Sequence, residues 1–191
     1  TSCTSLSSGW QALNRGDYSK AKEIAAYHLA LDPMNSEVYR LSASTYLAED
    51  HADEAIRSAK FAVTLDETNE QASVILQKAY AAKKDWNGLC TEVERASHLN
   101  IIRTSNEGLE SHWREGATSL LMAGQADGWP CYQALKNANA DVSTLPDLAK
   151  SRRAYSESLV RRGRYAEAIS MLESSADPYD NQLMAARVYY Q

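Results

Sequence analysis

The sequence predicts an all-α fold, an α-solenoid built from antiparallel helix pairs. Three observations lead to this prediction. Apolar and turn residues recur at a constant spacing of 34 positions over the first part of the chain. Only 4 prolines and 8 glycines interrupt the 191 residues, so long helices can form. Runs of β-branched residues with period-two alternation, the usual sign of strands, are absent from the sequence.

The repeat appears when the sequence is compared with itself. A shift of 34 positions carries Asp32 onto Asp66 and Asn35 onto Asn69. The same shift places apolar residues on apolar residues, including Ala21 on Ala55, Leu29 on Val63, Leu31 on Leu65, Tyr46 on Tyr80, Ala62 on Ala96 and Leu65 on Leu99. Consecutive units in one register indicate a stacked array, because a single helix pair cannot bury its own apolar face.

Each unit is predicted to contain two helices. We expect the first helices at 6–15, 37–49 and 69–83, and the second helices at 18–31, 52–65 and 86–99. Pro33 ends one of them after Asp32, because proline excludes the helical conformation from the residue before it. Asn35 and Asn69 precede new helices and are expected to cap them.

The first unit carries a family pattern in its turn and in its ending. Its turn is Gly16-Asp17-Tyr18, followed by the small residue Ala21, and its second helix ends in Leu-Ala-Leu-Asp-Pro at 29–33. These offsets resemble those of the tetratricopeptide repeat (TPR) family. Gly9 stands at the family's glycine in the first helix, whereas Ala43 and Gln77 replace it in the next two units. The resemblance implies three TPR-like repeats in 1–103.

The later part of the chain matches the pattern less evenly. Residues 147–191 are predicted to form a TPR-like repeat plus a final helix at 179–191, on the basis of matches at Tyr155, Leu159, Gly163, Tyr165 and Ala168. Residues 104–146 are interpreted as a degenerate repeat or connection, with helices at 107–123 and 129–138. This stretch is either a hinge between two sub-arrays or a poorly matching repeat within one stack. The chain would then hold about five units, one of them degenerate.

Composition narrows the function classes. The net charge is −5 and the pI is about 5.4, which argues against the broad cationic surface that non-specific nucleic-acid binding requires. No apolar run approaches the ~18 residues that a membrane-spanning helix needs. The 4 histidines are scattered and form no HExxH motif. We therefore expect no enzymatic activity, no cofactor and no metal site.

The family resemblance also implies a binding surface, because first helices line the concave side of a TPR array and contact a partner protein there. Carried onto this sequence, the contact positions include Leu6, Trp10, Leu13, Asn14, Arg40, Lys78, Lys150, Arg153 and Arg161. One end is apolar, and Trp10 either anchors a partner side chain or packs within the array. The other end is basic, with Arg152, Arg162 and Arg164 nearby. It either grips an acidic segment or terminal carboxylate, or is a solvated face balanced by Glu157.

One TPR binding mode is not expected. Cytosolic co-chaperones of the family hold a C-terminal carboxylate with a lysine, asparagine and arginine clamp. The corresponding positions of the first unit are Leu6 and Trp10, and those of the third unit are Gln71 and Ile75. The clear repeats therefore lack that clamp.

The three cysteines, Cys3, Cys90 and Cys131, bear on the cellular compartment. They are either unrelated thiols, or Cys90 and Cys131 pair in an oxidising compartment. Thr1-Ser2-Cys3 matches the last three positions of a bacterial lipobox, so Cys3 is a candidate lipidation site. With that anchor, the chain resembles small TPR lipoproteins of Gram-negative envelopes, which include pilotins and the Tad-type pilus lipoprotein.

The resemblance implies an outer-membrane protein on the periplasmic face that assists assembly of a pilus or secretion complex. Its partner would be a secretin or another envelope assembly component, with no nucleic acid and with membrane contact only through the lipid on Cys3. The alternative is a cytoplasmic TPR adaptor or secretion chaperone.

Overall fold

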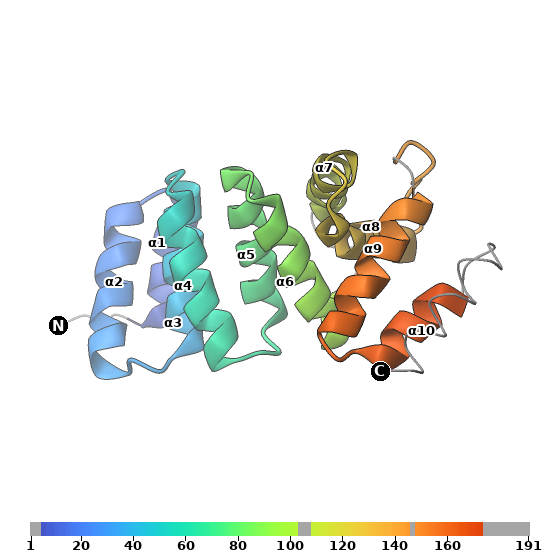
Figure 1. Ribbon diagram of the computed structural model, residues 1–191. Helices are drawn as coiled ribbons and strands as arrows, with labels where there is room; N and C mark the ends of the chain where they lie inside the picture. Colours follow the sequence, from blue (N-terminus) through green and yellow to red (C-terminus); the bar gives the residue numbers. More distant parts are fainter. Residues whose placement is uncertain (1–4, 103–107, 146–147, 174–191) are drawn as a thin grey trace.

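A computed structural model describes residues 5–102, 108–145 and 148–173, which form helices stacked in chain order (Figure 1). The predicted fold class is confirmed: the described part is a TPR-like α-solenoid of antiparallel helix pairs. Its helices are α1 Leu6–Asn14, α2 Tyr18–Leu31, α3 Ser36–Ala48, α4 Ala52–Leu65, α5 Glu70–Lys83, α6 Trp86–His98, α7 Leu109–Met122, the 3-10 turn η1 Ala126–Gly128, α8 Trp129–Asn137, α9 Leu148–Arg161 and α10 Tyr165–Glu173. None of these helices is long and apolar enough to cross a bilayer.

The predicted helices lie close to the observed ones. α2 and α4 have the predicted bounds, and the other bounds differ by one or two residues. The side chain of Asn35 accepts a hydrogen bond from the Glu37 N–H at 3.1 Å, and that of Asn69 accepts one from the Ala72 N–H at 3.0 Å. The predicted caps of α3 and α5 are thus confirmed. Cys3 and the helix predicted at 179–191 lie outside the described residues.

The turn inside each helix pair repeats through the array. Gly16, Asp50, Lys84 and Gly163 all adopt a left-handed conformation, with φ of 77°, 61°, 60° and 74°. In each case the next N–H bonds back to a carbonyl five residues earlier, as from Asp17 to Ala12 and from Asp85 to Tyr80. This closes the first helix with a Schellman-type cap.

The degenerate stretch contains the same turn. Gly124 has φ of 71°, and the Gln125 N–H bonds to the Leu120 carbonyl. From Lys84 to Gly124 is 40 residues and from Gly124 to Gly163 is 39, against 34 between the earlier turns. The extra residues fall in the junctions after α6 and after α8. The register is therefore lost between helix pairs and not within them.

The helices form two layers over the first seven helices. First helices contact their counterparts in the next pair, α1 with α3, α3 with α5 and α5 with α7. Second helices pack on the first helices beside them, α2 on α1 and α3, and α4 on α3 and α5. The row of first helices is the inner layer of a curved stack, and the row of second helices α2, α4 and α6 is its outer layer. We call the solvent side of α1, α3, α5 and α7 the inner face.

Small residues allow the close approach between layers. Ala21, Ala55 and Ala59 are fully buried, and a Cβ on Gly9 would lie 2.6 Å from the Leu41 side chain. One cluster of buried apolar side chains continues from α3 through the degenerate pair to α10. The core thus runs across the seam between the regular repeats and the C-terminal pair.

The last pair is placed differently from the others. α9 packs on α10, η1 and α8, and α6 contacts α8 directly. Second helices therefore contact each other at the seam, and the C-terminal pair lies at the end of the array against α8 and η1 (Figure 1).

Candidate functional site

The N-terminal end of the inner face carries the predicted apolar residues. Leu6, Trp10 and Leu13 are each half-buried and pack on a small core cluster formed by Ala25, Val38 and Leu41. Asn14 is exposed at the end of α1. The side chains of the apolar end therefore contribute to the core and keep part of their surface exposed.

Trp10 also carries a charged neighbour. The Arg40 guanidinium lies 4.2 Å from the centre of the Trp10 ring, a cation–π arrangement. Arg40 in turn forms an ion pair with Glu37 at 2.5 Å, and Glu37 accepts a hydrogen bond from the Asn69 amide at 3.0 Å. The hydrogen bond from Arg40 holds the pKa of Glu37 below its usual value, against the opposing effect of burial. These four residues join three successive helix pairs across the inner face.

The other predicted contact residues are spread along the array. Lys78 is half-buried on α5, while Lys150, Arg153 and Arg161 are exposed on α9. Because α9 packs on η1 and α8, its basic residues do not continue the row of α1, α3 and α5. The structure brings Trp10 and Arg40 together, whereas the basic residues of α9 lie at the C-terminal end of the array.

A buried polar chain crosses the third pair, and sequence reasoning missed it. The Trp113 indole N–H donates to the Gln77 side-chain oxygen at 2.8 Å, and the Gln77 amide donates to Ser73 at 3.2 Å. Ser73 donates to Glu92 at 2.5 Å, and Glu92 pairs with Arg95 at 2.7 Å. The one sequence feature that could have indicated this chain is Gln77, a polar residue at the first-helix position that Gly9 and Ala43 occupy in the earlier repeats.

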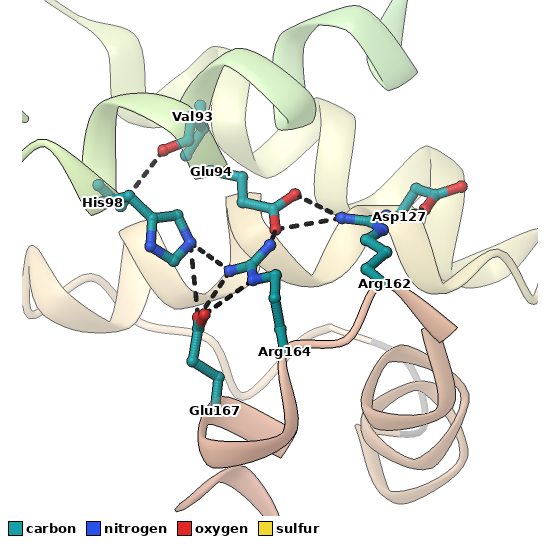
Figure 2. Close-up of polar contacts among 8 residues, drawn as sticks. Val93, Glu94, His98, Asp127, Arg162, Arg164 and Glu167 are labelled. Carbon is teal, nitrogen blue, oxygen red and sulfur yellow. Dashed lines mark hydrogen bonds and ion pairs between the residues drawn. The ribbon is translucent and has the colours of Figure 1, made fainter. Parts of the chain in front are cut away.

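Two arginines of the predicted basic end point toward Glu94 of α6 (Figure 2). Arg164 binds Glu94, Glu167 and His98, with Glu167 at 2.6 Å. Arg162 pairs with the same Glu94 at 3.1 Å and lies 3.7 Å from Asp127. Arg162 and Arg164 thus link the α9–α10 turn to α6. The carboxylates that pair with them lie on α6 and α10, and not on α9 where Glu157 was considered.

Glu94 is the centre of this cluster. Its side chain is only 11% exposed, so burial opposes its ionisation. Hydrogen bonds from Arg164 and Tyr155, together with the charges of Arg164 and Arg162, outweigh burial and lower its pKa. Burial and the Glu94 charge raise the pKa of Tyr155 above its usual value. Glu94 is therefore a carboxylate and Tyr155 a neutral donor over the physiological pH range.

The structure joins Cys90 of α6 and Cys131 of α8 in a disulfide. Both residues are fully buried. A Cβ on Gly116 of α7 would lie 3.2 Å from the Cys90 sulfur and 3.4 Å from the Cys131 sulfur, so α7 packs directly over the bond. The disulfide spans 41 residues of sequence and covalently ties the third pair to the degenerate pair.

An open cavity of about 500 Å³ lies beside the ionic cluster, between α6, α8, α9 and α10. Trp129, Tyr155 and Leu159 form part of its wall and are almost completely buried. Sequence reasoning did not find this cavity, because it depends on how the C-terminal pair docks. Over 5–102, 108–145 and 148–173, no group of three His, Cys, Asp or Glu side chains is arranged to hold a metal ion.

Comparison with known proteins places the fold. No family model matches the chain, and no curated protein matches it. TTC0263, a thermophilic TPR protein in Thermus thermophilus, aligns over 97% of each chain with 19% identity and a TM-score of 0.49. MamA aligns over 94% of this chain and 96% of its own, with 20% identity and a TM-score of 0.53. Together with the repeated helix pairs and turns, the likeness to MamA shows that the chain has the TPR-like solenoid fold.

Proposed function

We propose that this protein is a non-catalytic scaffold that binds a partner protein across the inner face of its helical array. The proposal rests on the continuous inner layer α1–α3–α5–α7, on which the Arg40 guanidinium stacks over the half-buried ring of Trp10. Tryptophan and arginine dominate the binding energy of many interfaces. A surface of this kind suits an extended polypeptide or a helix laid along the curve.

Site-specific photocrosslinking tests the proposal. The benzophenone amino acid p-benzoylphenylalanine is placed at Gln71, which is exposed on α5, and in a matched variant at Arg57, which is exposed on α4 of the outer layer. We expect a protein adduct from Gln71 and none from Arg57 in native extracts. Trp10→Ala and Arg153→Glu then report whether each end contributes to the capture. Equal adducts from both layers would contradict the inner-face assignment.

We further propose that the chain works in the bacterial envelope, as a lipoprotein anchored through Cys3 on the periplasmic face of the outer membrane. There it would assist assembly of a pilus or secretin complex. The Cys90–Cys131 disulfide supports this proposal, because such bonds persist in oxidising compartments and are rare in the cytosol. The cytoplasmic adaptor remains the alternative.

Mass spectrometry of the native protein tests the compartment. Intact mass after blocking of free thiols shows whether Cys90 and Cys131 are bonded in cells and whether Cys3 is acylated. We expect a bonded pair and an acylated N-terminal cysteine. An unmodified Cys3 still preceded by Thr1-Ser2 would contradict the lipoprotein, and free thiols at Cys90 and Cys131 would favour the cytoplasmic alternative.

A further inference from the structure

The cavity at the C-terminal end lies apart from the inner face. Three of the four helices that line it, α6, α8 and α10, are second helices of their pairs. Its volume, about 500 Å³, is within the range of ligand-binding clefts, and it is open to solvent. An open cleft at this end of the array admits a segment of chain that enters and leaves it.

The floor of the cavity is apolar and already packed. Trp129 and Tyr155 are 5% and 6% exposed, and the Trp129 ring packs on Tyr132 with 4.7 Å between ring centres. Leu159 and Met171 complete the apolar part of the wall. Because these side chains are held by the core, the floor keeps its shape in the absence of a ligand, which lowers the entropic cost of binding.

The charged groups on the wall are paired with one another. Arg164 binds both Glu94 and Glu167, and His98 lies 3.5 Å from Glu167 (Figure 2). A charged ligand group would have to displace one of these partners. The group that enters the cavity is therefore expected to be uncharged.

Two carboxamides of α8 face the same cavity. Gln133 and Asn137 are one helical turn apart on its wall, and neither side chain bonds to another residue in the part of the chain that the structure describes. A carboxamide offers one acceptor oxygen and two donor hydrogens. These groups can hydrogen-bond the N–H and C=O of a peptide group, so Gln133 and Asn137 can together bind a short stretch of extended backbone.

We propose that this cavity is a second binding site, which takes an extended polypeptide segment carrying one large uncharged apolar side chain. The side chain enters between Trp129, Tyr155 and Met171, while Gln133 and Asn137 hydrogen-bond the backbone on either side of it. The proposal rests on the scaffold role in that its ligand is a polypeptide. It adds a site at the C-terminal end, apart from the inner face, that can hold one segment while the inner face holds another.

Titration of the full chain with capped peptides, followed by NMR, tests the site. The probes are acetyl-Gly-Ser-X-Ser-Gly-amide with X as Phe, Leu, Ala or Lys, taken to millimolar concentration. We expect the Phe and Leu peptides to shift the Trp129 indole and the Gln133 and Asn137 side-chain amide signals. The Ala and Lys peptides should bind at least about tenfold more weakly, since they lack the apolar group to be buried.

Variants separate this site from the inner face. Gln133→Ala with Asn137→Ala should weaken binding of the Phe peptide several-fold at unchanged melting temperature, and Gln71→Ala on α5 should leave it unchanged. Binding without preference for X, no binding by any probe, or shifts on α3 and α5 in place of α8 would each overturn the cavity proposal. Shifts on α3 and α5 would contradict only the cavity proposal and would be consistent with binding at the inner face. If the Gln71 variant gave no crosslink while the peptides bound at the cavity, only the inner-face proposal would be contradicted.

Discussion

The regular pairs α1–α6 and the C-terminal part α7–α10 are held together in different ways. In α1–α6 the same small residues, caps and left-handed turns recur at a spacing of 34 residues, and neighbouring pairs meet through fully buried alanines such as Ala55 and Ala59. In α7–α10 the spacing between turns lengthens to 40 and 39 residues. There the joints carry a disulfide and a partly buried ionic cluster.

The two parts show how a solenoid stays continuous where its repeat spacing changes. The cross-pair ion pair between Lys83 and Asp53 in the regular part is exposed, with side chains that are 47% and 62% exposed. Exposed pairs of this kind contribute little stability. At the seam, Glu94 is 11% exposed and holds two arginines, and Cys90 is covalently linked to Cys131. Specific ion pairs and a disulfide thus connect the helix pairs at the seam, where the regular packing of the repeats is interrupted.

The largest effect is expected from the disulfide. Reduction, or Cys90→Ala with Cys131→Ala, should lower the free energy of unfolding by about 3 kcal/mol, because the cross-link restricts a long loop of the unfolded chain. Urea denaturation measures the change. Cys3→Ala is the matched control and should leave the midpoint unchanged. A midpoint that does not respond to reduction would show that the seam is held by packing alone.

The next largest effect concerns Gln77 at the edge of the regular part. Gln77→Ala should cost about 2 kcal/mol, because it leaves the buried Trp113 N–H without its acceptor and removes the amide that donates to Ser73. Denaturation followed by tryptophan fluorescence reports both the stability and the Trp113 environment. Gln71→Ala, an exposed position on the same helix, is the control. Equal stabilities for the two variants would contradict a structural role for the polar chain.

Glu94→Gln should destabilise the protein by about 1–2 kcal/mol, less than a fully buried ion pair because Arg162 and Arg164 are partly solvated. The lowered pKa of Glu94 fixes the pH dependence. The stabilisation is present above the unfolded glutamate pKa of about 4.3, and is lost as the pH falls through the lower folded pKa.

The difference between wild type and Glu94→Gln should therefore be constant from about pH 6 to 8 and shrink in acid. Glu157→Gln on α9 is the control for a general loss of charge. A gap that widens as the pH falls would contradict the assigned role of Glu94.

The smallest effect is expected at the N-terminal end. Arg40→Ala should cost about 0.5 kcal/mol, because its cation–π contact and ion pair are near the surface. It should also uncover one face of Trp10, which quenching of tryptophan fluorescence by acrylamide would detect. Arg57→Ala, which breaks an exposed pair with Glu54, serves for comparison. Unchanged quenching after Arg40→Ala would contradict the claim that Arg40 covers one face of the Trp10 ring.

Much of the regular part could be predicted from the sequence, because its determinants are local. Asp32-Pro33 ends α2, Asn35 and Asn69 cap the next first helices, and the alanines mark the close contacts. The candidate surface was predicted less well. Arg40 was recognised as an inner-face residue, but its position over Trp10 depends on how α1 packs against α3.

The ionic links of the C-terminal part could not be derived in the same way. Glu94 and Arg164 are 70 residues apart, and the extra junction residues remove the register that relates their helices. The sequence placed Arg162 and Arg164 near the basic group that contains Arg161, but it gives no indication of the α6 carboxylate that pairs with them. The cavity follows from the same docking and has no local signature.

Hydrogen exchange measured along a urea series, on the oxidised and the reduced protein, tests the central contrast most directly. In the oxidised protein we expect the described helices from α2 to α9 to open together at similar free energies. After reduction, α7, α8 and α9 should open first, with protection about a hundredfold lower, while α2, α3 and α4 keep theirs. Equal loss of protection in both parts, or no loss in either, would contradict the account.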